Sequence, residues 1–212
     1  MKLSVGRLSL TALVLITAVL IGASAFQPVA AQRQVEQDLS KTVEVLLAKE
    51  EIRQQIYNYS RGLDRMDKDL ALQVWHPDGT ADYGGQAVNG RALIEGIFQG
   101  LVNNVAHAHH MVDTMITVDG NKAVSETYAN SSLVIPLAEH SDQGVRVDSG
   151  GVSVSLIRGR YADRWSKRDG HWALDHRAYI EDFRTVQKVP GEPQLGRGTQ
   201  GRSDLSYSIF AF

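Results

Sequence analysis

The chain of 212 residues has no cysteine, which excludes disulfide bonds, thiol nucleophiles and cysteine-ligated metals. It has no basic cluster or stripe, and its formal net charge is only −2, so nothing indicates a nucleic-acid binder. No glycine run has a phosphate-binding pattern, and no serine lies in a sequence that predicts a nucleophile elbow. Any chemistry therefore depends on the remaining polar side chains, among them seven histidines.

Apolar residues make up 43% of the chain and charged residues 22%, which is ordinary for one globular domain with appendages. Residues 8–25 form an apolar run after Lys2 and Arg7, and small residues follow at 29–31. We predict a secretory signal at residues 1–31, cleaved after Ala31. The alternative is a retained anchor, but the run is near the lower limit for a membrane span. The mature protein is expected in the periplasm or secreted, with no membrane anchor.

After a polar leader at residues 32–41, a helix is predicted from about Ser40 or Thr42 to about Leu63. Its buried stripe recurs at helical spacing: Ile52, Ile56, Tyr59 and Leu63. Asp64 lies at the helix end, on the flank of that stripe, where its carboxylate can point into a cavity beneath the helix. The alternative is a solvated acid at a helix end.

A short second helix, capped by Asp67, and a third helix at residues 91–99 are predicted around a strand at residues 80–83. Four strands follow, joined by turns at residues 119–121 and 168–170: residues 107–118, 122–135, 152–167 and 172–183. This order predicts an α+β fold, a strongly curved, cone-shaped antiparallel sheet with three helices closing one pocket.

The predicted body spans residues 42–185. The polar stretch 136–151 is predicted to be a long loop, which serves either as a lid or binding loop or as flexible filler. The extension at residues 186–212 ends in apolar residues, so we expect it to pack on the body or on a neighbouring subunit.

The strand at residues 107–118 begins with three histidines. In strict alternation, His110 shares a face with Thr114, Ile116 and other β-branched residues, so it is expected to point into a core or pocket. A satisfied core histidine is the alternative. His107 and His109 share the other face, so one metal cannot easily bind all three, and no metal or other cofactor is predicted.

Several short motifs, in this order and spacing, resemble the SnoaL-like branch of the nuclear transport factor 2-like superfamily. They are residues 59–64 at the end of the first helix, residues 81–83 followed by Gly90, His110 followed by residues 118–120, and residues 159–163 leading to 169–172. Within this superfamily, the scytalone dehydratase and lindane dehydrochlorinase families are the most similar in the arrangement of the site.

The resemblance implies a catalytic pair of Asp64 and His110, in which the carboxylate holds a general base. It also implies that Tyr83 assists. The candidates to line the pocket, contact substrate or assist are Tyr57, Tyr83, Asn130, Arg160 and Tyr161. For Arg160, an ion pair with Asp163 or Glu126 is the alternative.

The implied function is a cofactor-free lyase acting on a small hydrophobic or aromatic molecule. Dehydratase-like elimination and carbon–carbon cleavage, such as deformylation of a lignin-derived diaryl compound, both remain open. The alternatives are a non-catalytic exported binding protein and an isomerase that uses the same base. The resemblance also implies a homodimer or homotrimer.

Overall fold

The computed structural model describes residues 10–141, 144–191 and 193–209, with backbone only at residues 10–28, 138–141 and 144–149. It forms two units, Met1–Leu46 and Leu47–Phe212. The second unit contains the body and the C-terminal tail. Residues 1–9 of the predicted signal lie outside the described residues.

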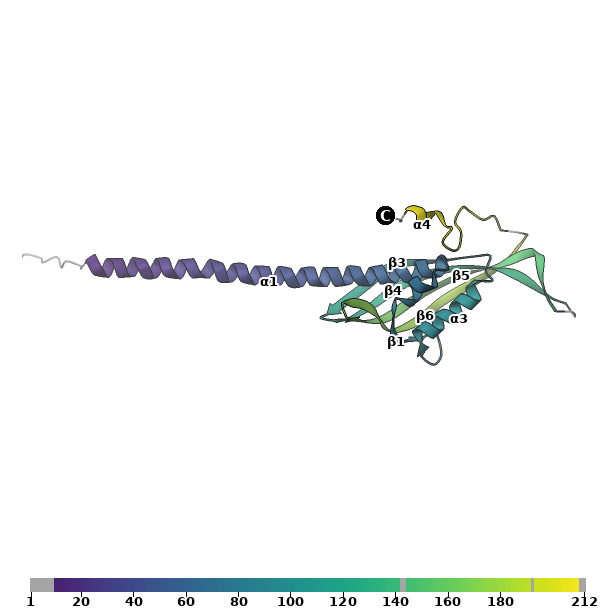
Figure 1. Cartoon of the computed structure of the whole chain (residues 1–212), viewed down its shortest axis with the longest axis horizontal. Coiled ribbons are helices and arrows are strands. Elements are labelled where there is room, and N and C mark those ends of the chain that lie inside the picture. Colours follow the sequence, from purple (N-terminus) through teal and green to yellow (C-terminus); the bar gives the residue numbers. More distant parts are fainter. Residues whose placement is uncertain (1–9, 142–143, 192, 210–212) are drawn as a thin grey trace, which may run out of the picture. The chain divides into compact units, whose positions relative to one another are not determined.

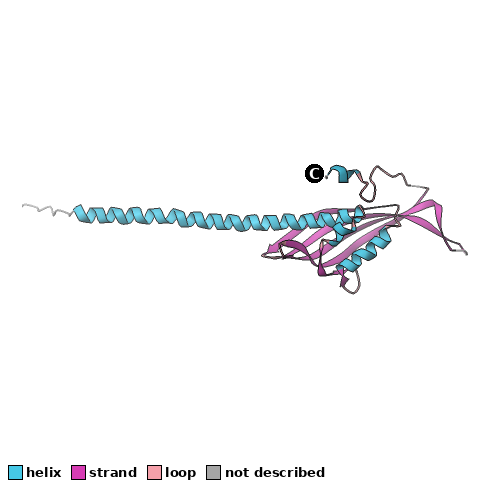
Figure 2. Cartoon of the chain, viewed as in Figure 1, coloured by secondary structure: helices cyan, strands magenta, loops and turns pink. Residues whose placement is uncertain are grey.

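Helix α1 runs from Leu10 to Asp64, 55 residues, so the predicted start near Ser40 is wrong (Figure 2). Residues 32–61 contain neither glycine nor proline, and nothing in them interrupts the helical hydrogen bonds. The predicted end of the helix differs from the observed one by a single residue. No helix in the described part of the chain is long and apolar enough to span a membrane.

The body contains one six-stranded sheet with the order β2-β1-β6-β5-β4-β3 (Figure 1). The strands are β1 (Trp75–Asp82), β2 (Val88–Asn89), β3 (Ala106–Asp119), β4 (Lys122–Ser141), β5 (Gly144–Arg168) and β6 (His171–Pro190). The further helices are α2 (Lys68–Leu72), α3 (Gly90–Leu101) and α4 (Leu205–Ile209). The α+β class is therefore confirmed.

Three details of the prediction need correction. The sheet is not purely antiparallel, because β1 pairs with β6 in parallel. The described residues form four helices rather than three, and the sheet does not close on itself. The predicted loop at residues 136–151 belongs mostly to the β4–β5 hairpin, whose pairing continues from Pro136↔Val152 to Ser141↔Gly144. Residues 142–143 of that stretch lie outside the described residues.

The predicted stripe of α1 is buried, with Ile52, Ile56, Tyr59 and Leu63 each at most 1% exposed. These side chains belong to the same core as Ile94 and Phe98 of α3 and the sheet residues Trp165, Trp172 and Leu174. The core thus joins the last part of α1, from Ala48 to Leu63, to one face of the sheet.

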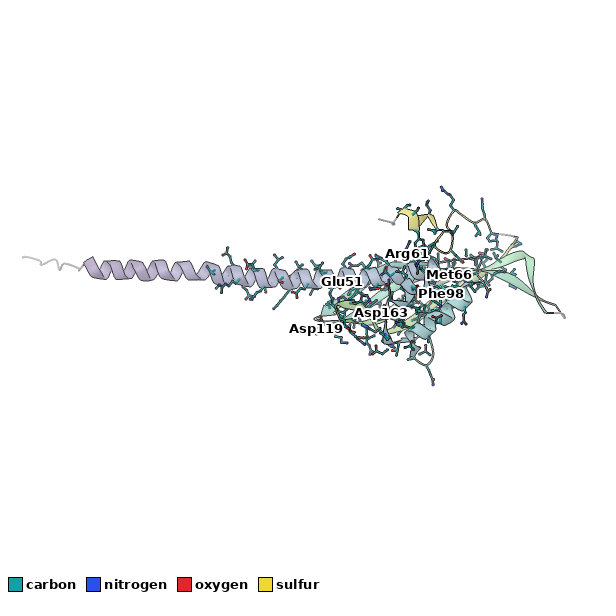
Figure 3. All side chains as sticks on the ribbon, in the orientation of Figure 1. Glu51, Arg61, Met66, Phe98, Asp119 and Asp163 are labelled. Atoms are coloured by element: carbon teal, nitrogen blue, oxygen red, sulfur yellow. The ribbon has the colours of Figure 1, made fainter. Side chains whose placement is uncertain are left out.

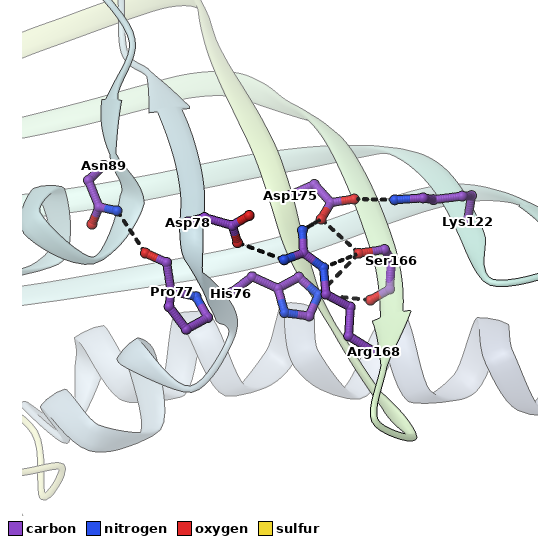
Figure 4. Close-up of polar contacts among 8 residues, drawn as sticks. All are labelled: His76, Pro77, Asp78, Asn89, Lys122, Ser166, Arg168 and Asp175. Atoms are coloured by element: carbon purple, nitrogen blue, oxygen red, sulfur yellow. Dashed lines mark hydrogen bonds and ion pairs between the residues drawn. The ribbon is translucent and has the colours of Figure 1, made fainter.

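Arg168, the last residue of β5, joins the β5–β6 turn to β1 (Figure 4). Its guanidinium donates to Asp78 Oδ1 at 2.7 Å, to Ser166 Oγ at 3.1 Å and to Asp175 Oδ1. The buried His76 imidazole donates from Nε2 to the Ser166 carbonyl at 3.0 Å. Residues 76–79 are part of β1, which these contacts hold against β5 and β6.

Strand β3 contains a bulge that decides which histidines face α1. Met111 pairs with Ala129 of β4, whereas Thr114 pairs with Thr127, so β3 has one residue more than its partner between these pairs. An extra residue moves every side chain on one side of it to the opposite face of the strand. The alternation of side chains between the two faces of β3 is therefore interrupted at the bulge.

Candidate active site

Asp64 and His109 form the centre of the candidate site. The Nδ1–H of His109 donates to Asp64 Oδ1 at 2.7 Å, and the backbone N–H of His109 donates to Oδ2 at 3.0 Å. A carboxylate can only accept, so Nδ1 carries the proton and Nε2 of the neutral ring has a free lone pair. Nε2 has no hydrogen bond to any residue that the structure describes, and the side chain retains 9% exposure.

His107 lies beside this pair, with its ring centroid 6.2 Å from that of His109. Its Nε2–H donates to the Leu63 carbonyl at 3.0 Å, and its Nδ1 lies 3.1 Å from the amide nitrogen of Gln200. Burial lowers the pKa of His107, which favours the neutral ring near neutral pH.

His110, predicted to pair with Asp64, is exposed on the opposite face of β3. The bulge explains the correction. Ile116, beyond the bulge, is buried as alternation from His110 predicts, but before the bulge the buried face carries His107 and His109 instead. The predicted pairing of Asp64 with His110 is therefore wrong, and Asp64 binds the neighbouring histidine.

A second feature is a fully buried ion pair between β5 and β6. Arg177 donates from Nε and Nη2 to the two oxygens of Asp163, each at 2.8 Å, and both side chains are 0% exposed. The guanidinium lies 4.0 Å from the ring centroid of Tyr161 and 4.4 Å from that of Tyr59. Burial alone would lower the pKa of Arg177, but the Asp163 carboxylate raises it well above its usual value.

A cluster of four tyrosines adjoins this ion pair. The hydroxyl oxygens of Tyr59 and Tyr83 are 2.8 Å apart, and the ring of Tyr161 contacts those of Tyr59, Tyr83 and Tyr179. Burial raises the pKa of Tyr83 and of Tyr161 well above the usual value, so both phenols stay protonated. The site thus contains hydroxyl donors on the same side of the sheet as His109.

The five residues predicted to contact substrate do not lie together. Some are on one face of the sheet, some on the other, and one is on α1. Tyr83 and Tyr161 belong to the tyrosine cluster, whereas Tyr57 is 47% exposed. Arg160 forms ion pairs with Asp182 at 2.9 Å and with Glu126 at 3.5 Å, so the Glu126 alternative was correct. Asn130 pairs with His110 across β3 and β4 and shares its outward face. Tyr57, Asn130 and Arg160 therefore lie apart from the cluster.

A cavity of about 480 Å³ lies beside Asp64. Its walls come from the end of α1, the start of β3 and the C-terminal tail: Asp64, Arg65, Val105, Ala106, His107, Leu195, Gly196, Gly198, Thr199 and Gln200. Within the described residues, no group of three or more His, Asp or Glu side chains is arranged to hold a metal ion.

With this geometry established, sequence comparison identifies the family. A model of the SnoaL-like domain matches residues 44–178, more than half of the chain. The chain belongs to the SnoaL-like domain family. The match includes Asp64, His109 and the ion pair of Asp163 and Arg177, but it ends before the C-terminal tail. A comparison with curated protein sequences finds no match.

Solved structures support the same SnoaL-like fold. A protein named as a candidate scytalone dehydratase from Novosphingobium aromaticivorans is 18% identical, with a TM-score of 0.54 over 73% of this chain and 97% of its own. Hexachlorocyclohexane dehydrochlorinase LinA-type3 from Novosphingobium barchaimii is 14% identical, with a TM-score of 0.54 over 71% and 96%. A protein of unknown function from Mycobacterium tuberculosis is 22% identical, with a TM-score of 0.50 over 65% and 73%.

Proposed function

We propose that this SnoaL-like protein is a lyase that needs no cofactor, with His109 as the general base and Asp64 as the residue that orients it. One observation carries the proposal. Asp64 holds His109 by two hydrogen bonds, one of which fixes the tautomer with a free Nε2. A histidine held in this way is suited to accept a proton near neutral pH.

In the proposed reaction, Nε2 of His109 removes a proton from a carbon next to a carbonyl or aryl group. The electron pair of the broken C–H bond forms a double bond, and a leaving group on the next carbon departs with its own bonding pair. The Asp64 carboxylate stabilises the imidazolium that forms. A positioned base of this kind typically contributes about a hundred- to ten-thousandfold in rate.

The tyrosine cluster is proposed to bind the leaving group. Across β3, β4 and β5, one row of paired residues separates the row that contains His109 from the row that contains Tyr161. This row consists of Met111, Ala129 and Gly159, and two of these three residues are small. A protonated phenol can donate a hydrogen bond to a departing oxygen, which then leaves as water once it receives the abstracted proton.

The proposed substrate is a small hydrophobic or aromatic molecule. The rings of Tyr59, Tyr83, Tyr161 and Tyr179 supply apolar surface, and the buried cation of Arg177 is already neutralised by Asp163. The names of two similar structures, a dehydratase and a dehydrochlorinase, denote elimination reactions and support the same class. Carbon–carbon cleavage of a diaryl compound is a further reaction that this base can start.

The test is mass spectrometry of wild-type protein and a His109→Asn variant, incubated with aromatic alcohols, diarylpropanes and cyclic ketones. The proposal expects a product lighter by water, formaldehyde or another small fragment, formed by wild type alone. A product of unchanged mass would indicate an isomerase. A compound retained by both proteins without turnover would indicate a binding protein and overturn the proposal.

A further inference from the structure

The C-terminal tail, outside the part of the chain that matches the family model, is fixed against the end of α1. The backbone N–H of Gly201 donates to the Arg65 carbonyl at 2.8 Å, and Arg65 Nη1 donates to the Thr199 carbonyl at 2.6 Å. Arg65 also pairs with Asp204 at 3.2 Å. Thr199 and Gly201 are therefore both held by one residue of the segment that follows Asp64, and Gln200 lies between them.

A second set of contacts anchors the tail through α4. The hydroxyl of Tyr207 donates to Asp67 Oδ2 at 2.9 Å, and the Arg61 guanidinium lies 4.6 Å from the centroid of the Tyr207 ring. Figure 3 shows Arg61 on the side of α1 that faces α4. The tail is thus fixed on both sides of Gln200 by contacts that do not involve the Gln200 side chain.

The Gln200 side chain completes the hydrogen bonding of His107. Since the Leu63 carbonyl can only accept, Nε2 of His107 carries the proton, and Nδ1 of the neutral ring must accept. The Gln200 amide nitrogen, 3.1 Å away, supplies the donor. In the neutral form, both ring nitrogens of His107 then have a hydrogen-bond partner. In the charged form, Nδ1 would also carry a proton, and the Gln200 amide nitrogen could not accept it in this orientation.

The charge of His107 matters to the proposed base. Consecutive residues of α1 hold the two rings, with the Leu63 carbonyl on His107 and the Asp64 carboxylate on His109. A positive charge on His107 would oppose the positive charge that His109 gains when it takes a proton. The charged and titratable groups around His107 are Asp64, the last residue of α1, Arg65, which follows it, and His109 on β3.

We propose that Gln200 is a positioning residue that keeps His107 neutral and so leaves Asp64 free to support the charge on His109. The proposal rests on the proposed function of the Asp64–His109 pair. It assigns a role to the tail, which lies outside the part of the chain that matches the family, residues 44–178.

The test is a Gln200→Leu variant, which keeps the approximate size of the side chain and removes the donor. Loss of a hydrogen bond to the neutral ring raises the pKa of His107 by about half to one unit. Because a charged His107 opposes the positive charge that His109 gains in the transition state, kcat/KM is expected to fall at acid pH, with activity above neutral pH little changed. Gln194→Leu makes the same change at an exposed position of the tail and is expected to leave the profile unchanged.

A second readout is independent of turnover. NMR titration of the His107 ring protons is expected to show the same upward shift in Gln200→Leu and none in Gln194→Leu, whether or not a substrate has been found. An unchanged His107 titration would overturn the proposal, as would an equal loss of activity at every pH, which indicates a purely structural role. If the wild-type protein shows no turnover but the His107 titration is shifted in Gln200→Leu, the lyase proposal fails, while the hydrogen bond from Gln200 to His107 is supported.

Discussion

Asp64 and His109 are joined twice, because one oxygen of the carboxylate accepts from the ring and the other from the backbone N–H of the same residue. The backbone bond fixes the carboxylate relative to β3, and the ring bond fixes the imidazole relative to α1. A side chain held from both directions loses little conformational freedom when substrate binds. This relationship underlies the proposed role of His109.

Replacing Asp64 with asparagine tests the support given to the base. The amide oxygen can still accept one hydrogen bond, but the negative charge that stabilises the imidazolium is lost. We expect kcat/KM to fall by about a hundred- to ten-thousandfold, measured on the substrate found by the product screen. Asp69→Asn, at an exposed position of α2, is the control and is expected to retain full activity.

The buried ion pair makes a prediction about stability. Asp163→Asn leaves Arg177 charged and unpaired in the core, which costs about 3–5 kcal/mol of the free energy of unfolding. Urea unfolding monitored by circular dichroism measures this loss. Asp182→Asn, which removes an exposed partner of Arg160, is expected to change stability little. Equal effects of the two variants would contradict the account.

Two glycines of α3 provide a matched test of packing. A Cβ at Gly90 would lie 2.1 Å from Cε3 of Trp75, which is buried, so Gly90→Ala is expected to destabilise by about 1–3 kcal/mol. A Cβ at Gly96 meets no atom within 4 Å, so Gly96→Ala is expected to stabilise the helix by about 0.5–1 kcal/mol. Thermal unfolding of both variants checks the opposite signs, and a stabilised Gly90→Ala protein would show that Trp75 is packed differently.

The N-terminal sequence predicts export. Expression of the full chain in a Gram-negative host is expected to give a periplasmic protein whose first residue is Gln32. N-terminal sequencing and intact mass determine this directly. A protein that keeps residues 1–31 in the membrane fraction would support the anchor alternative instead.

The sequence predicted much of the fold because its signals are local. The helical spacing that ends at Leu63, the cap at Asp67 and the glycine turns at Gly120 and Gly170 each depend on a few neighbouring residues. The parallel pairing of β1 with β6 has no such signal, because it joins segments about a hundred residues apart in the chain. The predicted start of α1 was wrong for a different reason, since a polar composition does not by itself end a helix.

The site was predicted in part. Asp64 was predicted from its place at the end of a buried stripe. The choice of His110 over His109 depended on alternation through β3 and on the resemblance to the family. The bulge between Met111 and Thr114 arises from pairing with β4, which no pattern within β3 reveals. Gln200 could not be found from sequence, because its contact with His107 spans 93 residues and depends on the docking of the tail.

The most direct test of the account compares His109→Asn with His110→Asn in one assay of kcat/KM on the same substrate. Asparagine can still donate toward Asp64 at position 109, but it cannot act as the base, and His110 is exposed on the other face of the strand. We expect the His109 variant to lose about a hundred- to ten-thousandfold and the His110 variant to remain close to wild type. An active His109→Asn protein together with an inactive His110→Asn protein would contradict the assignment of the base.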